Sequence, residues 1–153
     1  MRNQNKLQLA QLHSKLMPLS TQASFSVPEK GWIFTLRSIL NITLEQLSNK
    51  LNLTKQGVKK IEEREVNTSV SLKTLIEVGD ALDLKLVYAY IPKEGSFEDL
   101  VANRAYKIAE KIVLRTHQNM QLENQGNSAK KIKHAIKELA EELQREMPKA
   151  LWD

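Results

Sequence analysis

The chain has 153 residues, 41% of them hydrophobic, so it can form one compact domain with additional helices and bury a core. It contains no cysteine, which excludes disulfides, a thiolate nucleophile and a thiolate metal site, and favours a reducing compartment. The formal net charge of +5 favours a polyanionic partner, although charge alone is weak evidence for nucleic-acid binding.

Residues 1–28 are expected to form an N-terminal helical arm and a linker. The pattern over residues 2–17 predicts a polar helix with leucines on one face, and Pro18 is expected to end it. The start of the chain has no apolar stretch of signal-peptide length, and no segment reaches the roughly 20 apolar residues of a membrane helix. We therefore expect a cytoplasmic protein with no membrane partner.

Residues 29–83 are expected to form a compact bundle. Apolar residues recur at helical spacing in four short stretches, residues 32–40, 44–51, 55–64 and 72–82. Thr43, with Gln46 three residues later, has the sequence of a capping box at the start of the second stretch, and Thr54 can cap the third. Two helix starts so close together predict a tight helix-turn-helix.

Residues 84–93 are expected to contain a strand that forms a dimer. The run 84–91 is rich in β-branched and aromatic side chains, and Pro92 ends it. A lone strand has unpaired edges and the sequence offers no second convincing strand, so its best partner is the same strand of a second molecule. The residues expected at this interface are Leu86, Val87, Tyr88 and Tyr90.

Residues 94–153 are expected to form two further helices. The first covers residues 96–122, residues 123–127 interrupt the pattern, and the second covers residues 128–147. The second is amphipathic, with an apolar stripe that needs a partner. The expected fold class is therefore mainly α, a helix-turn-helix bundle with one added strand and extra helices at both ends.

The third helix of the bundle carries the candidate site. Val58 and Ile61 point inward, whereas the opposite surface carries Lys and Gln side chains. In a helix-turn-helix protein this helix lies in the major groove, where Gln can pair with adenine and Lys can contact guanine or phosphate. We therefore expect double-stranded DNA as the partner. The expected DNA-binding residues are Thr43, Thr54, Lys55, Gln56, Lys59, Lys60, Arg64 and Asn67.

Several motifs carry a family resemblance: Arg37, TLEQLS at 43–48, TKQGVKKIE at 54–62 and SLKTL at 71–75. With them, residues 31–83 resemble the helix-turn-helix domain of the phage-repressor type, also called the XRE family. The resemblance implies a lambda-repressor-like fold and a structural ion pair between Arg37 and Glu62. Leu44 departs from the pattern, since such repressors often have a polar residue there.

The segments PEKGWI at 28–33 and ALDLKLVYAYIPK at 81–93 extend the match. Together these residues resemble the family called mobile mystery protein A, whose genes typically neighbour one encoding a Fic-domain protein. This resemblance implies an antitoxin-like or autoregulatory role. Antitoxins that inhibit Fic enzymes directly have Ser or Thr four residues before a Glu followed by Gly or Asn. Here Tyr90 precedes Glu94 and Asn119 precedes Glu123, so direct inhibition is not expected.

We therefore expect a dimeric regulator that binds a two-fold symmetric operator and represses its own operon. An enzyme is the alternative of another class, but the sequence has no motif for a nucleophile, a metal or an acid–base set. The histidines His13, His117 and His134 lack ligand spacing, so neither metal nor cofactor is expected. The third interpretation is an antitoxin-like protein whose helices 96–122 and 128–147 bind a Fic-domain partner.

Overall fold

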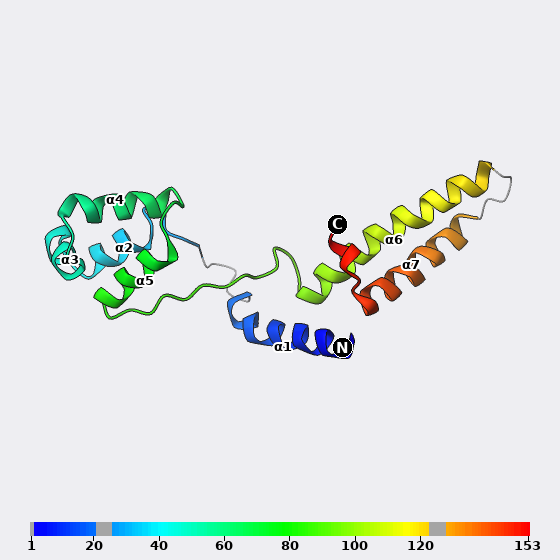
Figure 1. Ribbon diagram of the computed structural model, residues 1–153, viewed down its shortest axis with the longest axis horizontal. Helices are drawn as coiled ribbons and strands as arrows, with labels where there is room; N and C mark the ends of the chain where they lie inside the picture. The colour runs from blue at the N-terminus through cyan, green and yellow to red at the C-terminus, as the bar shows by residue number, and fades with distance from the viewer. Residues whose placement is uncertain (1, 21–25, 123–127) are drawn as a thin grey trace. The chain divides into compact units, whose positions relative to one another are not determined.

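The computed structural model describes residues 2–20, 26–122 and 128–153, so the interruption expected at 123–127 and part of the linker lie outside the described residues. In this part of the chain the regular structure is helical, which confirms the predicted mainly α class but not its added strand (Figure 1). The chain divides into two compact units: the bundle unit, residues 23–89, and the hairpin unit, residues 1–22 with 90–153. None of the described helices is long and apolar enough to cross a membrane.

The bundle unit contains four short helices, α2 (Trp32–Ile39), α3 (Leu44–Leu51), α4 (Lys55–Val66) and α5 (Leu72–Ala81). Three of them begin with a hydroxyl cap: Thr43, Thr54 and Ser71 each accept a hydrogen bond from the backbone N–H three residues later. These caps fix where each helix starts. The observed bounds agree with the four predicted stretches to within two residues.

All four helices of the bundle unit contribute to one apolar core. Its buried members are Ile33, Leu47, Val58, Ile61 and Val78. Each aliphatic side chain of this kind contributes about 1.5–3 kcal/mol when it is fully removed from water. Because α4 supplies two of these residues, Val58 and Ile61, one side of that helix is buried in the core.

The strand predicted at residues 84–91 is wrong for the single chain. These residues have no regular secondary structure, although Leu84 N–H still donates to the carbonyl of Gly79 at 2.8 Å. A strand requires a neighbouring strand with which to form a hydrogen-bond ladder, and no described segment of this chain supplies one. The added strand is therefore absent from the single-chain fold.

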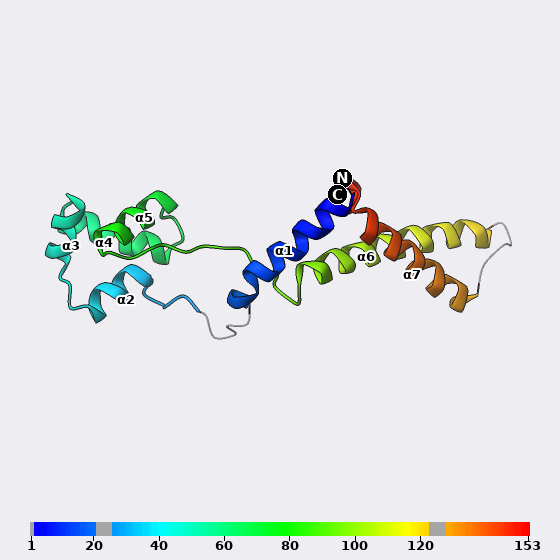
Figure 2. The same ribbon diagram turned by 90° about the horizontal axis from the view of Figure 1, so that it is seen from below.

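The hairpin unit contains α1 (Arg2–Ser20), α6 (Phe97–Leu122), α7 (Ala129–Glu146) and the 3₁₀ helix η1 (Lys149–Trp152). Helices α6 and α7 form an antiparallel pair (Figures 1 and 2). Small residues line their contact, with Ala105 and Ala109 on α6 and Ala140 on α7. The short side chains let the two backbones approach closely.

The N-terminal arm packs with the C-terminal helices. Leu9 of α1 lies against the cluster formed by Val101, Ala105 and Leu151. The expected break at Pro18 is wrong, since α1 continues to Ser20. Proline removes one backbone donor, but only two residues follow it in the helix, so the loss is confined to the last turn.

Candidate nucleic-acid interface

The candidate interface is built around the turn between α3 and α4. Asn52 ends α3 in the left-handed conformation with φ of 54°, which asparagine tolerates better than most residues. Leu53 N–H then donates to the carbonyl of Ser48 at 2.9 Å. Thr54 accepts from Gly57 N–H at 3.0 Å and starts α4. These local contacts make residues 52–54 a tight, defined turn between two helices.

Helix α4 has two different sides. Val58, Ile61 and Glu62 are buried. The opposite side exposes polar and basic residues from the predicted site, namely Lys55, Gln56, Lys59 and Lys60. Gln56 lies in the first turn of the helix. The structure therefore brings these four side chains onto one solvent-facing surface of a single rigid element.

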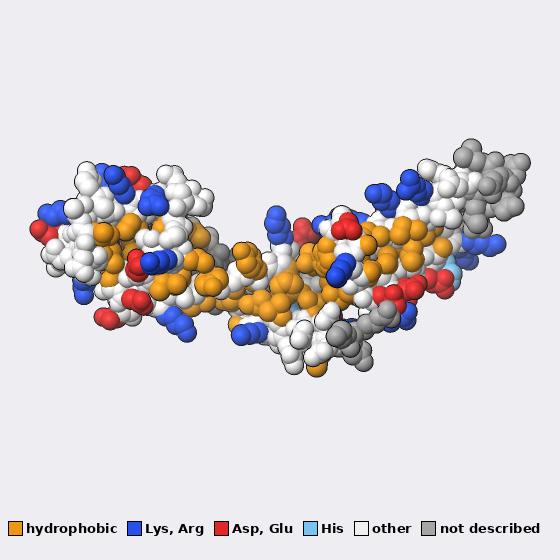
Figure 3. Space-filling model, viewed as in Figure 1, with side chains coloured by type: hydrophobic (Ala, Val, Ile, Leu, Met, Phe, Trp, Pro, Cys, Tyr) orange, Lys and Arg blue, Asp and Glu red, His pale blue; other side chains and the backbone are white. Residues whose placement is uncertain are grey.

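Two carboxylates modify the charge of this surface. Glu63 is exposed and lies one turn after Lys59 and Lys60, on the same face of α4. Lys55 Nζ lies 3.1 Å from a carboxylate oxygen of Glu45 on α3, in an exposed pair. Figure 3 accordingly shows both basic and acidic side chains on the bundle unit. Exposed pairs of this kind contribute about 0–1 kcal/mol, so Lys55 can change partners.

The other predicted site residues lie at the ends of these helices. Thr43 Oγ1 accepts from Gln46 N–H at 3.1 Å and donates to Gln46 Oε1 at 3.2 Å, so the capping box engages this hydroxyl. Thr54 caps α4 in the contact described above. Arg64 and Asn67 are exposed at the C-terminal end of α4, roughly 13 Å or more along the helix from Lys55.

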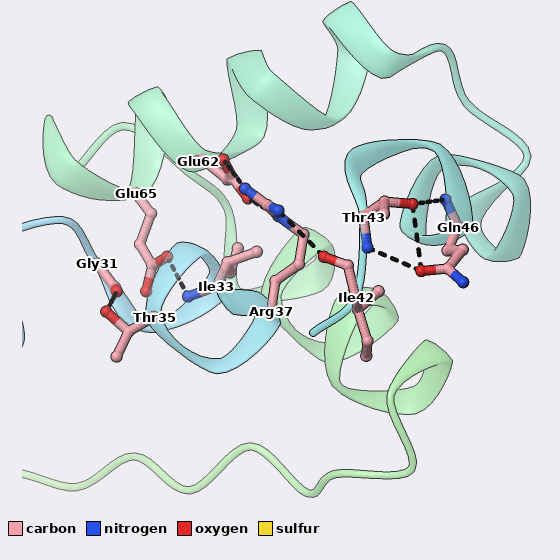
Figure 4. A network of polar contacts seen from close by, with 9 residues as sticks. All are labelled: Gly31, Ile33, Thr35, Arg37, Ile42, Thr43, Gln46, Glu62 and Glu65. Carbon is pink, nitrogen blue, oxygen red and sulfur yellow. Dashed lines mark hydrogen bonds and ion pairs between the residues drawn. The ribbon is translucent and has the colours of Figure 1, made fainter. Parts of the chain in front are cut away.

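An ion pair connects α4 to α2. Arg37 Nε donates to Glu62 Oε1 at 2.7 Å and Nη2 donates to Oε2 at 3.4 Å, with side chains only 13% and 9% exposed (Figure 4). Arg37 Nη1 also donates to the carbonyl of Ile42 at 3.1 Å, and the guanidinium lies 5.3 Å from the ring centroid of Phe34. This fork of contacts limits rotation of α4 about its axis.

A second carboxylate of α4, which the sequence did not reveal, also binds α2. Glu65 accepts from the backbone N–H groups of Trp32 and Ile33, each at 2.9 Å. A negative charge at this position suits the positive end of the α2 dipole. The sequence feature that indicates a need for such a contact is Gly31. It precedes α2 and has no side chain that could cap the helix.

Gly31 is required by the same contact. Its φ is +78°, and an added Cβ would lie 2.8 Å from Glu65 Oε2. Any other residue would therefore be strained and would displace the carboxylate. Glu62 and Glu65, three residues apart, together hold the inner side of α4 against α2, so that the outer side faces solvent in a fixed orientation.

The residues expected at a dimer interface are mostly solvent-exposed. Leu86 is half-buried, whereas Val87, Tyr88 and Tyr90 are 68%, 68% and 88% exposed. Within the described residues, no group of three His, Asp or Glu side chains is arranged to hold a metal ion.

Comparison of the chain with protein families, curated proteins and solved structures found no match. The outer side of α4 presents an amide and several ammonium groups on a fixed helix, and such donors suit base edges and phosphate oxygens.

Proposed function

We propose that this protein is a sequence-specific DNA-binding regulator of the phage-repressor type, and that α4 is its recognition helix. The observation that carries the proposal is the division of α4 into a side fixed to α2 by Glu62 and Glu65 and a side exposing Gln56, Lys59 and Lys60. A recognition helix needs both sides, because bases are recognised accurately only by a helix that is held in place.

In this proposal Gln56 contacts a base. It lies in the first turn of α4, and the N-terminal residues of a recognition helix reach base edges in the major groove. Its amide can donate to and accept from adenine at once. In the same proposal Lys59 and Lys60 contact phosphates. Thr54 and Lys55, at the N-terminal end of α4, lie near the sugar–phosphate backbone of the DNA.

The proposed regulator acts as a homodimer in the cytoplasm and represses its own operon. A two-fold dimer places two recognition helices about 34 Å apart, which matches half-sites one helical turn apart. The support for a dimer is the segment 84–91, whose apolar and aromatic side chains remain exposed in the single chain.

Binding to DNA upstream of the gene tests the proposal. After footprinting has located the site, Gln56→Ala should cost about 1–3 kcal/mol at that site and relax the preference at one base position. Lys59→Ala and Lys60→Ala should weaken binding to cognate and random DNA alike and reduce its dependence on salt. Gln144→Ala, on the exposed side of α7, is the control and should leave binding unchanged. A chain that leaves all upstream DNA unprotected would refute the proposal.

A second candidate function is binding of a Fic-domain protein by the hairpin unit. Several large apolar side chains of this unit remain exposed, namely Tyr106, Ile112, Leu114 and Trp152. Together with the resemblance to mobile mystery protein A, this surface supports an antitoxin-like role alongside DNA binding. Co-purification with the product of a neighbouring Fic-domain gene tests it, and separate elution of the two proteins would argue against it.

A further inference from the structure

The two units of the chain differ in charge. The bundle unit has nine basic and eight acidic residues, a net charge of +1, although it carries the proposed recognition helix. The hairpin unit has fourteen basic and ten acidic residues, a net charge of +4. Contacts with phosphates supply nearly all of the affinity of proteins for non-specific DNA. Most of the net positive charge available for such contacts therefore lies outside the bundle unit.

The charge of the hairpin unit is concentrated in residues 107–138, from the middle of α6 to the middle of α7. This segment has seven basic and three acidic residues, whereas the rest of the unit has seven of each sign. We call the seven Lys and Arg residues of this segment the basic end of the hairpin. All of them are exposed, and Figure 3 shows basic side chains on both outer edges of this part of the unit.

Three cations of the basic end form a stripe along α6. Lys107, Lys111 and Arg115 are four residues apart, so they are neighbours on the helix surface and repel each other. A solvated helix usually gains stability by pairing opposite charges at this spacing. Among the described residues no salt bridge involves any of the three. The stripe therefore adds repulsion to α6 without any compensating ion pair.

The start of α7 has the same property. Lys130 and Lys131 lie in its first turn, which contains no acidic residue, and the positive end of the helix dipole disfavours cations there. Lys133 and Lys137 are again four residues apart. No salt bridge in the described part of the chain involves a lysine of α7. Two antiparallel helices thus bring unpaired cations to the same end of the hairpin (Figure 1).

We propose that the basic end of the hairpin binds the phosphates of double-stranded DNA without regard to sequence, in addition to the contact made by the proposed recognition helix. This inference rests on the proposed function, and it names where the chain obtains affinity that α4 does not supply. Like charges that repel each other within their own helices are stabilised when a polyanion neutralises them.

The spacing of the cations suits a phosphate backbone. The stripe on α6 is about 12 Å long, since eight residues separate its ends and each adds about 1.5 Å. Successive phosphates of one DNA strand are about 3.4 Å apart along the duplex axis, so the stripe spans about three of them. Lysine side chains have flexible four-carbon stems and can adjust to these positions.

A membrane surface is the other polyanion that attracts exposed lysines, but α7 lacks the free apolar side that it would need. A helix that lies on a membrane inserts an apolar side into the lipid. The apolar side of α7 is already used, because Ile132, Ile136 and Leu139 pack in one cluster with Ala109 and Val113 of α6. The start of α7 therefore offers charge without a free apolar side, which favours DNA.

Charge-removing variants of the full chain test the proposal. Two variants each replace three cations of the basic end with glutamine, which preserves helix propensity. They are Lys107→Gln with Lys111→Gln and Arg115→Gln on α6, and Lys130→Gln with Lys133→Gln and Lys137→Gln on α7. The control removes the same charge from exposed positions elsewhere in the unit: Lys6→Gln with Lys15→Gln and Lys149→Gln. Circular dichroism checks that the three variants keep the helical content of the wild type.

Fluorescence anisotropy measures binding to a footprinted site and to a random duplex of equal length over a range of salt concentrations. At least one basic-end variant should bind both duplexes at least about tenfold more weakly than the wild type, with a slope of log K against log salt that is shallower by about 2–3. The control should change either affinity by less than about threefold. Gln56→Ala differs from these variants, since it should weaken binding to the footprinted site alone.

The outcomes separate this inference from the proposed function. If both basic-end variants bind as the control does, the basic end is not a DNA contact, while protection of an upstream site would still support α4 as the recognition helix. If the wild type binds every duplex equally and a basic-end variant loses that binding, this inference stands and the sequence-specific function fails. Binding to phosphatidylserine vesicles but to no duplex would overturn the proposal in favour of a membrane surface.

Discussion

The bundle unit and the hairpin unit achieve helical packing by different means. In the bundle unit the helices have only 8 to 12 residues, and hydroxyl caps together with the carboxylates of Glu62 and Glu65 fix their ends and orientations. In the hairpin unit α6 and α7 have 26 and 18 residues and pack along a seam of alanines. Helices shorter than about 12–15 residues are marginal alone, so the bundle depends on directional contacts that long helices do not need.

This contrast predicts different sensitivities. In the bundle unit, loss of one polar group should be costly, because few contacts fix each helix. In the hairpin unit, an increase in side-chain size along the seam should be costly, because the close approach of two backbones depends on small residues.

The largest expected effect is that of Glu62→Ala, which leaves the partly buried Arg37 guanidinium without its carboxylate partner. The free energy of unfolding of the bundle unit should fall by about 3–5 kcal/mol. The matched control is Glu63→Ala, an exposed residue next in sequence, which should change it by less than about 0.5 kcal/mol. Urea unfolding measures the change in the free energy of unfolding, and amide hydrogen exchange shows whether the change lies in the bundle unit. Equal effects of both changes would show that the ion pair does not stabilise α4.

An intermediate effect is expected for Ala109→Leu at the seam of α6 and α7. The larger side chain should force the helices apart and reduce the stability of the hairpin unit by about 1–3 kcal/mol. Lys111→Leu adds the same side chain at an exposed position of α6 and serves as the control. Faster amide exchange in α6 and α7, with unchanged exchange in the bundle unit, is the expected result. An unaffected Ala109→Leu variant would mean that the seam can repack.

The smallest effect is a pH dependence at the start of α6. The Asp99 carboxylate accepts from the Ser96 hydroxyl at 2.8 Å and from Ser96 N–H at 2.7 Å. Hydrogen bonds from the Ser96 hydroxyl and then its N–H lower the pKa of Asp99, desolvation opposes them, and the charge of His13 lowers it further. The folded pKa of Asp99 therefore lies below its ordinary value. The contacts between the ionised Asp99 carboxylate and Ser96 stabilise the start of α6 fully above a pH of about 3.9, and this stabilisation is lost as the pH falls through the folded pKa.

Amide exchange in the first turn of α6 between about pH 5 and pH 2 measures this loss. Asp99→Asn should remove the transition, since the amide does not titrate. If the Asp99→Asn variant shows the same transition as the wild type, the transition belongs to another titrating group.

Local patterns predicted the helices and the α3–α4 turn well. Thr43, Gln46 and Thr54 mark helix starts through contacts three residues apart, and such contacts are visible in a sequence. The exposed side of α4 followed from helical periodicity in the same way.

Long-range contacts were not predictable by this means. Glu65 caps a helix that begins 33 residues earlier, and Leu9 packs against residues near the other end of the chain. Periodicity shows that a face will be buried but does not identify what covers it. The strand at 84–91 failed for a related reason: its composition predicts extended backbone, but a ladder also needs a second strand.

The contact between Lys55 and Glu45 has a consequence for the proposed DNA binding. Each phosphate neutralised by a lysine releases counterions, which makes binding weaken as salt rises. In the proposed complex Lys55 leaves Glu45 for a phosphate, so the loss of the existing pair offsets part of the gain from the new contact. Under that proposal, the pair at 3.1 Å would make Lys55 contribute less to DNA affinity than a lysine with no carboxylate beside it.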